Sequence, residues 1–371
     1  LLLLRMSNNV FIAPSVGYRI EGSADQEPKT FDCSSIPNVF EGVFDLSDND
    51  SRYFRETFLD KDHSNFIAKG LPENPVCISI ILDTDGKNYS GLIRTATGNE
   101  RVNVAASSVK TTWWRNLFKS GPSPFDILKA MAPQYQKGMK LITDTSLPQA
   151  LLNLEEKQAI KGFKFGILYS MDGQNKEDEM FANVQCSPEF DEFIDFLGDR
   201  VQLNGWGNFR AGLDVRSGTT GTHSIYQRWN NNEIMFHVST LLPFNVKDKQ
   251  QLERKRHIGN DIVVIVFQDG DTVYRPTTIS SRQVLVVLVV KAVKIDNERF
   301  YRLAIVSRDA VPEFGPAMPA NGLFKKDQAF KDFLYAKLLN AERAAYSAPI
   351  LEMKLSRTRR ALLKDVSESF C

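Results

Sequence analysis

The chain has 371 residues, which is enough for two domains and a sizeable core. Apolar residues make up 42% of it and charged residues 25%, an ordinary globular composition that excludes disorder, collagen and a coiled coil as the main architecture. With 46 basic and 45 acidic residues the net charge is +1, so electrostatics gives no reason to expect a nucleic acid or an anionic membrane as the main partner.

No membrane segment or secretion signal is predicted. The longest apolar run, Val284 to Val290, is far shorter than the ~20 residues that a membrane span requires. The leucines at 1–4 are too few for a signal peptide. Four cysteines are widely scattered, without the spacing of a zinc or redox site. We therefore expect reduced thiols and a cytoplasmic location, and neither a metal nor a cofactor.

Residues 1–155 are predicted to form an N-terminal α+β domain. Residues 1–50 are rich in turn residues and show little periodicity. A helix is expected to begin after the prolines of 121–124. An antiparallel meander is predicted from three runs typical of strands, at 76–82, 91–96 and 102–105.

Residues 156–325 are predicted to form an α/β domain around a mostly buried mixed sheet. Two continuous apolar runs, 262–267 and 284–293, are typical of strands that are covered on both faces. Further strands are predicted at 163–169, 234–238 and 300–307, and helices at 176–181, from Ser187 onward and at 247–258.

Residues 326–371 are predicted to be helical and to pack on the N-terminal domain. Pro349 separates a first helix from a second stretch at 351–366. One apolar stripe of the first helix is suited to a packing role, and its members are Phe330, Phe333, Leu334, Leu338, Ala341 and Ala345.

The common catalytic motifs are missing from the sequence. It contains no GxxxxGK[ST], HExxH or GxSxG pattern. The glycine-rich segment 216–223 is either a phosphate-binding loop or a flexible connection between strands. The histidines are far apart, and each is predicted to be structural rather than a metal ligand: His63, His223, His237 and His257.

A basic helix that leads into a buried strand stands out at 250–261. Arg256 and Asn260 are four residues apart and share a face of this helix, and His257 lies one turn from Asn260. An asparagine at the exposed end of a rigid helix can reach into a partner. The alternative is that Gly259 and Asn260 only end the helix, as this pair commonly does.

A family resemblance is carried by a series of segments in the second half of the chain. They resemble the GTPase-activating domain of the Rap-specific GAP family, which includes the Rap GAPs, the signal-induced proliferation-associated proteins and tuberin. The order and spacing agree over roughly 160–345, and the branch resembled most is the signal-induced proliferation-associated one. The segments are 164–169, 179–181, 187–190, 209–214, 220–226, 233–240, 254–263 and 309–316.

The resemblance implies a mechanism as well as a fold. Members accelerate GTP hydrolysis on Rap GTPases, which lack the glutamine that orients the attacking water in Ras. The family instead inserts an asparagine, the thumb, from its catalytic helix, and Asn260 falls on that position. A carboxamide offers a donor and an acceptor, so it can hold the water in line while contacting a γ-phosphate oxygen.

Neighbouring residues receive roles from the same resemblance. Arg256 is expected to hold the helix or to engage the GTPase. His257 is expected either to support the thumb or to be structural. Asp261 is expected to anchor the helix end, and Arg254 and Lys255, in the family's basic run, are expected to bind the partner.

One departure from the family pattern affects the partner. Where the family has an aromatic residue and, two residues later, a histidine, this chain has Gln283 and Leu285. Because the aromatic residue contacts the GTPase in the family, Gln283 is a candidate partner-binding position that affects binding strength or the choice of GTPase.

The resemblance thus implies a catalytic activator without a substrate pocket of its own. Its partner would be a Rap-type GTPase with bound GTP and magnesium. The catalytic domain would resemble a G domain, and the N-terminal α+β domain would mediate homodimerisation. Two alternatives stay open: activation of another GTPase, of the Rheb or Ral type, and a non-catalytic module that binds a GTPase or dimerises.

Overall fold

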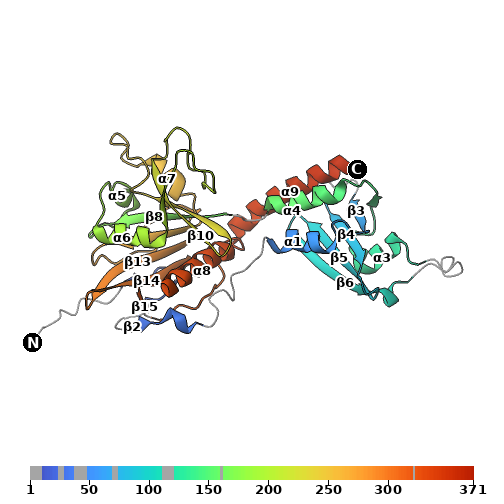
Figure 1. Ribbon diagram of the computed structural model, residues 1–371, viewed down its shortest axis with the longest axis horizontal. Coiled ribbons are helices and arrows are strands. Elements are labelled where there is room, and N and C mark those ends of the chain that lie inside the picture. The colour runs from blue at the N-terminus through green and yellow to red at the C-terminus, as the bar shows by residue number, and fades with distance from the viewer. Residues whose placement is uncertain are drawn as a thin grey trace, which may run out of the picture. The chain divides into compact units, whose positions relative to one another are not determined.

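The computed structural model describes residues 11–23, 29–36, 48–68, 74–110, 121–158, 162–320 and 322–371. They form two compact units, and each unit combines two separate stretches of chain (Figure 1). Unit 1 consists of Leu1–Phe44 and Lys161–Ala348, and unit 2 of Asp45–Ile160 and Pro349–Cys371. None of the described helices is long and apolar enough to cross a membrane.

Unit 1 is built on a ten-stranded mixed sheet, as predicted, with the strand order β2-β15-β14-β13-β12-β8-β11-β10-β9 and with β1 paired to β14. The strands β11, β8, β12 and β13 run parallel at its centre, and β12 is buried over its whole length. The bounds are β1 Tyr18–Glu21, β2 Lys29–Phe31, β8 Gly162–Ser170, β9 Asp199–Gln202, β10 His223–Trp229, β11 Asn232–Val238, β12 Val263–Gln268, β13 Val286–Ile295, β14 Glu298–Arg308 and β15 Gly322–Lys325.

One face of this sheet is covered by two helices with aromatic side chains, α6 (Pro188–Leu197) and α8 (Gln328–Ala345). Phe193 of α6 lies 5.3 Å from the ring of Phe267 in β12, and Phe196 stacks on Phe330 of α8 at 6.0 Å. Helix α6 begins as predicted, because the Ser187 side chain accepts a hydrogen bond from the Phe190 N–H and proline occupies the first helical position.

The opposite face carries the short helices α5 (Glu177–Phe181) and α7 (Leu252–Ile258). Because side chains alternate along a strand, Leu168 of β8, Met235 of β11 and Val264 of β12 share this face and pack in one cluster with Ile258 of α7. The basic helix singled out in the sequence therefore lies on the sheet centre, over the parallel strands.

Unit 2 is built on a five-stranded antiparallel sheet in the order β6-β5-β4-β3-β7. The predicted meander is confirmed by β4, β5 and β6. The helices pack on the sheet in two apolar clusters, one with α3 and the other with α1, α4 and α9. The bounds are α1 Asp48–Thr57, β3 Ser64–Ala68, β4 Cys77–Leu82, β5 Asn88–Thr95, β6 Gly98–Ala105, α3 Pro124–Met131, β7 Met139–Ile142, α4 Leu147–Gln158 and α9 Pro349–Phe370.

The boundaries of the units differ from the predicted domains 1–155, 156–325 and 326–371. The loop-rich start contributes β1 and β2 to the sheet of unit 1, where β1 pairs antiparallel with β14. The two C-terminal helices belong to different units, α8 to unit 1 and α9 to unit 2. Short strands escape a periodicity analysis because three or four residues show no clear alternation.

The apolar stripe on α8 does not form a surface. Phe330, Phe333, Leu334, Leu338 and Ala341 each have 0% exposure within the single chain. Phe330 stacks on Phe324 of β15 at 4.9 Å. The stripe is buried in the core of unit 1, where it packs on the sheet. The prediction that it packs on the N-terminal domain is therefore wrong.

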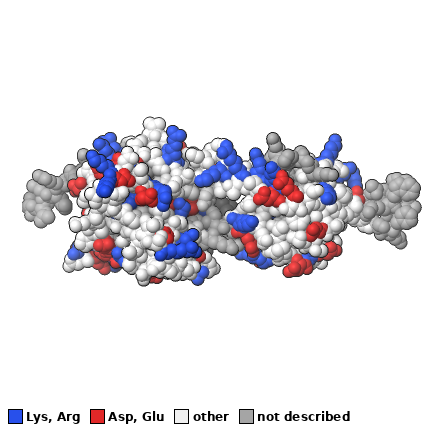
Figure 2. Space-filling view, turned by 90° about the horizontal axis from the view of Figure 1, so that it is seen from above, with Lys and Arg blue, Asp and Glu red and all other residues white. Residues whose placement is uncertain are grey.

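Charges of both signs are interspersed over the face shown in Figure 2, with Lys and Arg next to Asp and Glu in each unit. This agrees with the net charge of +1. This face therefore offers local charged groups rather than one large surface of a single sign.

Candidate functional site

Helix α7 begins later than the sequence predicts, because residues 245–251 close a hydrogen-bonded turn. The Gln251 side chain accepts from the Asn245 N–H at 3.0 Å and donates to the Asn245 carbonyl at 2.6 Å. Gln251 is buried and has a φ of 50°, a left-handed conformation that is uncommon outside glycine. Asp248 accepts a hydrogen bond from the first helical N–H, that of Leu252, at 2.7 Å.

Asn260 lies in an exposed turn directly after α7. Its Nδ2 donates to the Arg256 carbonyl at 2.7 Å, so the side chain folds back over the helix end. No described residue donates a hydrogen bond to its Oδ1. The amide oxygen is therefore open to a partner, as the thumb prediction requires. The Nδ2 group meanwhile caps the end of α7, which is the alternative role expected for Asn260, so the two roles are compatible.

A buried carboxylate supports this turn from below. Asp261 has 0% exposure. Its Oδ1 accepts from Lys164 Nζ at 2.8 Å, and its Oδ2 lies 2.8 Å from His237 Nδ1. Lys164 Nζ also donates to the Asn260 carbonyl at 2.9 Å. Lys164 thus contacts both Asn260 and Asp261, and these contacts give the expected anchoring role of Asp261 a physical basis.

His237 connects this network to a loop. Its Nε2 lies 3.0 Å from the carbonyl of Ala211. Because a carbonyl only accepts, Nε2 must carry a hydrogen. The two ring contacts fix the orientation of the imidazole, so the loop, β11 and the end of α7 are joined through one buried side chain.

His257 faces inward rather than toward the surface. Its ring lies 5.3 Å from the ring of His237, and its Nε2 is buried without a hydrogen-bond partner among the described residues. Burial, with a further effect from His237, lowers the pKa of His257 to about 4. The ring is therefore neutral near pH 7 and packs beneath the turn that carries Asn260.

The basic residues of α7 occupy three different environments. Arg256 is exposed and pairs with Glu253 at 3.1 Å on the helix surface. Lys255 is half-buried and pairs with Glu177 at 3.1 Å and with Asp178 at 2.5 Å. Desolvation opposes its charge, but the hydrogen bonds to Asp178 and Glu177 outweigh it, and the pKa of Lys255 is raised.

Arg254 is a correction to the predicted site. It is 2% exposed, so it cannot contact a partner. Its guanidinium has no carboxylate partner among the described residues, and burial lowers its pKa to about 10. It donates instead to backbone carbonyls of two segments, those of Phe181, Asn183, Leu242 and Pro243. Arg254 is therefore a structural link that holds α7 to α5 and to the loop after β11.

The positions where the chain departs from the family lie beside the thumb turn. Gln283 is half-buried, and Leu285 is buried in the core at 4% exposure. The hydroxyl of Ser281 donates to the Gly259 carbonyl at 2.6 Å, which ties this segment to the end of α7. Gln283 is thus in reach of a partner at the site, whereas Leu285 is not.

A pocket of about 230 Å³ opens next to Asn260. Part of its wall is fixed by Glu177, which accepts hydrogen bonds from the Ser280 N–H and hydroxyl as well as from Lys255. It is lined by Leu168, Glu177, Phe181, Lys255, Ile258, Gly259, Asn260, Ile279, Ser280, Ser281 and Val284. We call it the thumb pocket. The described residues include no group of three histidine, cysteine or acidic side chains that could hold a metal ion.

Three residues of the site were not among the predicted ones. Lys164 and His237 lie inside segments that carry the family resemblance, but their sequence positions on separate strands do not show that both reach Asp261. Ser281 lies two residues before Gln283, in a segment without periodicity. Only the three-dimensional register of β8, β11 and β12 brings the first two together.

Comparison with known proteins assigns this arrangement to a family. Residues 180–360 match the family described as Rap/ran-GAP. The chain therefore carries a domain of this family, as the resemblance implied.

Its relatives include both proteins named for this domain and the branch predicted from the sequence. "GTPase-activating Rap/Ran-GAP domain-like protein 3" of Danio rerio is 38% identical over 324 residues, which cover 85% of this chain and 31% of that protein. "Signal-induced proliferation-associated protein 1" of Homo sapiens is 38% identical over 327 residues, with the same coverage of 85% and 31%. A structure described as "Structure of the TSC2 GAP domain" is 31% identical, covers 50% of this chain and 96% of that one, and has a TM-score of 0.45. The chain spans about a third of the length of the curated relatives it matches.

Proposed function

We propose that this chain is a GTPase-activating module that accelerates GTP hydrolysis on a small GTPase of the Rap type. The observation that supports it most is the position of Asn260. Its amide is exposed at the end of a helix, its Oδ1 accepts no hydrogen bond from a described residue, and its backbone carbonyl is held by Lys164. Membership in the Rap/Ran-GAP family supports the same reaction.

The proposed chemistry needs only positioning and preorganised dipoles. On a GTPase with bound GTP and magnesium, the Asn260 carboxamide would orient the attacking water and contact the γ-phosphate. The ion pair of the buried Asp261 with the partly exposed Lys164 limits the motion of the turn, so little rearrangement is needed when charge develops. Arg256, exposed one turn away, is proposed to engage the GTPase, and His257 is proposed to support the thumb by packing.

Single-turnover hydrolysis on purified Rap loaded with GTP tests this proposal. Replacing Asn260 by alanine should lower the rate constant by about 100-fold or more, as loss of one positioned catalytic group does in other enzymes. The variant should still fold, because the exposed side chain makes one hydrogen bond, worth about 1 kcal/mol. Asn153→Ala, an exposed asparagine on α4, is the matched control and should leave the rate unchanged. Normal activity of Asn260→Ala would refute the thumb assignment.

The same assay separates the alternatives. A chain that is inactive on Rap but active on a Rheb-type or Ral-type GTPase would be a GAP of different specificity. A chain that binds a GTPase loaded with a non-hydrolysable GTP analogue, yet accelerates none, would be the non-catalytic module.

Homodimerisation through unit 2 and a cytoplasmic location are also part of the proposal. The first is supported by the family resemblance alone, and the burial of the α8 stripe removes one surface from consideration. Light scattering on the purified chain tests it, since a monomeric mass at micromolar concentration would overturn it. The second is supported by the free cysteines Cys33, Cys77, Cys186 and Cys371, which suit a reducing compartment. Fractionation of cells expressing the full-length protein tests it.

A further inference from the structure

The segment between Ile279 and Leu285 forms a rigid ledge beside the thumb pocket. Ser280 donates to Glu177 from its N–H at 2.8 Å and from its hydroxyl at 2.6 Å. Ser281 donates to the Gly259 carbonyl at 2.6 Å. Arg308 holds the segment from the other side, by donating to the carbonyls of Ser281 and Val284, each at 3.2 Å.

Arg282 is presented by this ledge without a partner. Its neighbours in the chain are tied down on both sides, but Arg282 itself is exposed. Among the described residues it has neither a hydrogen bond nor an ion pair. Its position differs from that of Lys255, whose charge is already balanced by Glu177 and Asp178, and from that of Arg256, which pairs with Glu253.

The surrounding sequence offers no acidic group to balance Arg282. The stretch from Thr272 to Ile295 contains arginine and lysine but no aspartate or glutamate. The nearest carboxylate along the pocket wall, that of Glu177, is occupied by Ser280 and Lys255. An exposed, unbalanced guanidinium on an ordered segment beside a docking site complements an anionic group on the partner, and a carboxylate is the group that its planar fork binds best among protein side chains.

We propose that Arg282 is a specificity-determining residue that pairs with a carboxylate on the protein surface of the bound GTPase. This inference rests on the proposed function and names the chemistry of the contact at the edge of the same site. The backbone of the ledge is already ordered, and Arg282 has no ion pair with a described residue to break on binding. It therefore favours GTPases with an acidic side chain opposite the ledge and disfavours those with a basic one.

Kinetics on the most responsive member of a panel of purified Rap-type, Rheb-type and Ral-type GTPases test this pairing. Arg282→Glu should raise KM by about tenfold or more while kcat stays within about twofold, since a charge at the edge of an interface acts on association. Arg282→Lys should retain most of the affinity. The KM of the parent should rise with salt more steeply than that of Arg282→Glu, which is a difference that a merely structural residue would not give.

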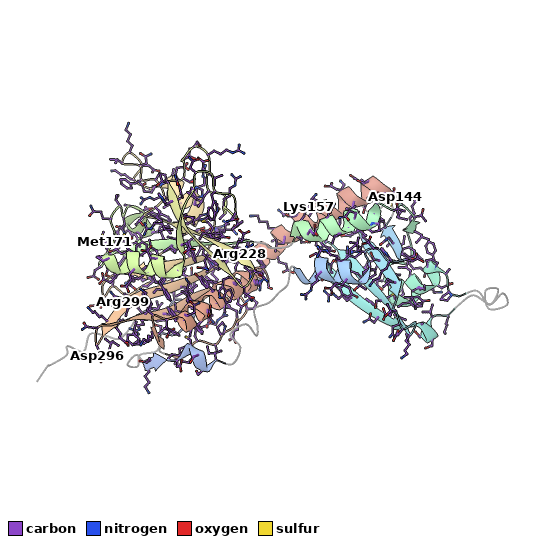
Figure 3. All side chains as sticks on the ribbon, in the orientation of Figure 1. Asp144, Lys157, Met171, Arg228, Asp296 and Arg299 are labelled. Carbon is purple, nitrogen blue, oxygen red and sulfur yellow. The ribbon has the colours of Figure 1, made fainter. Side chains whose placement is uncertain are left out.

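Arg228 supplies the matched control. It is an exposed arginine of β10 in the same unit and lies well apart from α7 in Figure 3. Arg228→Glu makes the same change in net charge, so it should leave KM and its salt dependence close to those of the parent. Reversing single acidic residues on the GTPase should identify one whose lysine variant restores a low KM with Arg282→Glu.

The other outcomes are distinct from each other. An unchanged KM and salt response in Arg282→Glu would overturn the pairing and leave Arg282 as a solvated side chain. A large fall in kcat at constant KM would overturn it in favour of a contact with the nucleotide phosphates. If the parent accelerates none of the GTPases, the proposed function fails. The pairing of Arg282 is then tested by binding alone: Arg282→Glu, but not Arg228→Glu, should bind a GTPase loaded with a non-hydrolysable analogue more weakly than the parent does. Absence of binding to all of them would refute both.

Discussion

Replacing Gly166 by alanine should displace Asn260, the proposed thumb, from beneath. Gly166 lies in the middle of β8, where α7 crosses the strand. A Cβ atom at this position would lie 2.7 Å from Cγ2 of Ile258 and 3.2 Å from Oδ2 of Asp261. Ile258 is the last residue of α7 and is 1% exposed, so the helix cannot avoid the new methyl group by turning a side chain into solvent.

The size of the effect follows from these distances. Carbon atoms in contact are normally about 3.5–4.0 Å apart, so the end of α7 must move by the order of 1 Å. Overpacking of this kind lowers the free energy of unfolding by about 1–3 kcal/mol. A misplacement of about 1 Å at a catalytic group can cost on the order of 100-fold in rate. We therefore expect a folded variant whose kcat for GTP hydrolysis falls by more than its stability loss alone would suggest.

Single-turnover hydrolysis and urea denaturation measure the two effects separately. Gly207→Ala is the control, because a Cβ there would meet nothing within 4 Å. Combining Gly166→Ala with Ile258→Ala removes the closest contact, so the double variant should recover turnover while remaining less stable. If Gly166→Ala loses stability but keeps its kcat, the contact between α7 and β8 does not determine the position of the thumb.

Three further predictions concern buried groups. Asp261→Asn removes the buried carboxylate that Lys164 and His237 contact, and because Lys164 is partly exposed while His237 is buried, it should lower the free energy of unfolding by about 1–3 kcal/mol; an unchanged free energy of unfolding in urea denaturation would contradict this. Burial raises the pKa of Glu342 to about 7 from 4.5, so the folded state binds this proton more tightly than the unfolded chain does, and stability falls as pH rises through that window. The free energy of unfolding of Glu342→Gln should therefore fall less than that of the parent between about pH 5 and about pH 8. If the two free energies change equally with pH, Glu342 is not the group that titrates. Leu338→Asp should abolish the cooperative unfolding transition, since burying a charge at a position with 0% exposure costs more than about 4 kcal/mol; a folded variant with a changed mass would make α8 an interface after all.

The sequence predicts the central sheet well, because its strands have a strong local signal. The continuous apolar runs at 262–267 and 284–293 correspond to β12 and β13, which lie side by side in parallel. The start of α6 follows from Ser187 and Pro188 for an equally local reason. Pairings between distant segments have no such signal: Tyr18 opposes Arg308 in the register of β1 and β14, and nothing near Tyr18 indicates it.

The candidate site was predictable in part for a related reason. Asn260 was found from a motif along one segment of chain. The burial of Arg254, in contrast, depends on where Phe181 and Leu242 place their carbonyl groups, and these residues come from other segments. A run of basic residues therefore indicates a helix near a partner, but which of its members face that partner is determined by tertiary packing.

The division of the chain into units has a consequence for how the protein can fold during synthesis. Each unit contains a segment that lies beyond the other along the chain: β1 and β2 precede unit 2, and α9 follows the last helix of unit 1. The β1 strand has no partner until β14 has left the ribosome, and the apolar cluster under α9 stays uncovered until α9 itself has been made. Contacts of such sequence separation form slowly, and neither unit is complete before the other has largely been made. A single cut in the chain cannot separate them, and a fragment restricted to 180–360 would lack β8, the strand on which the thumb helix rests.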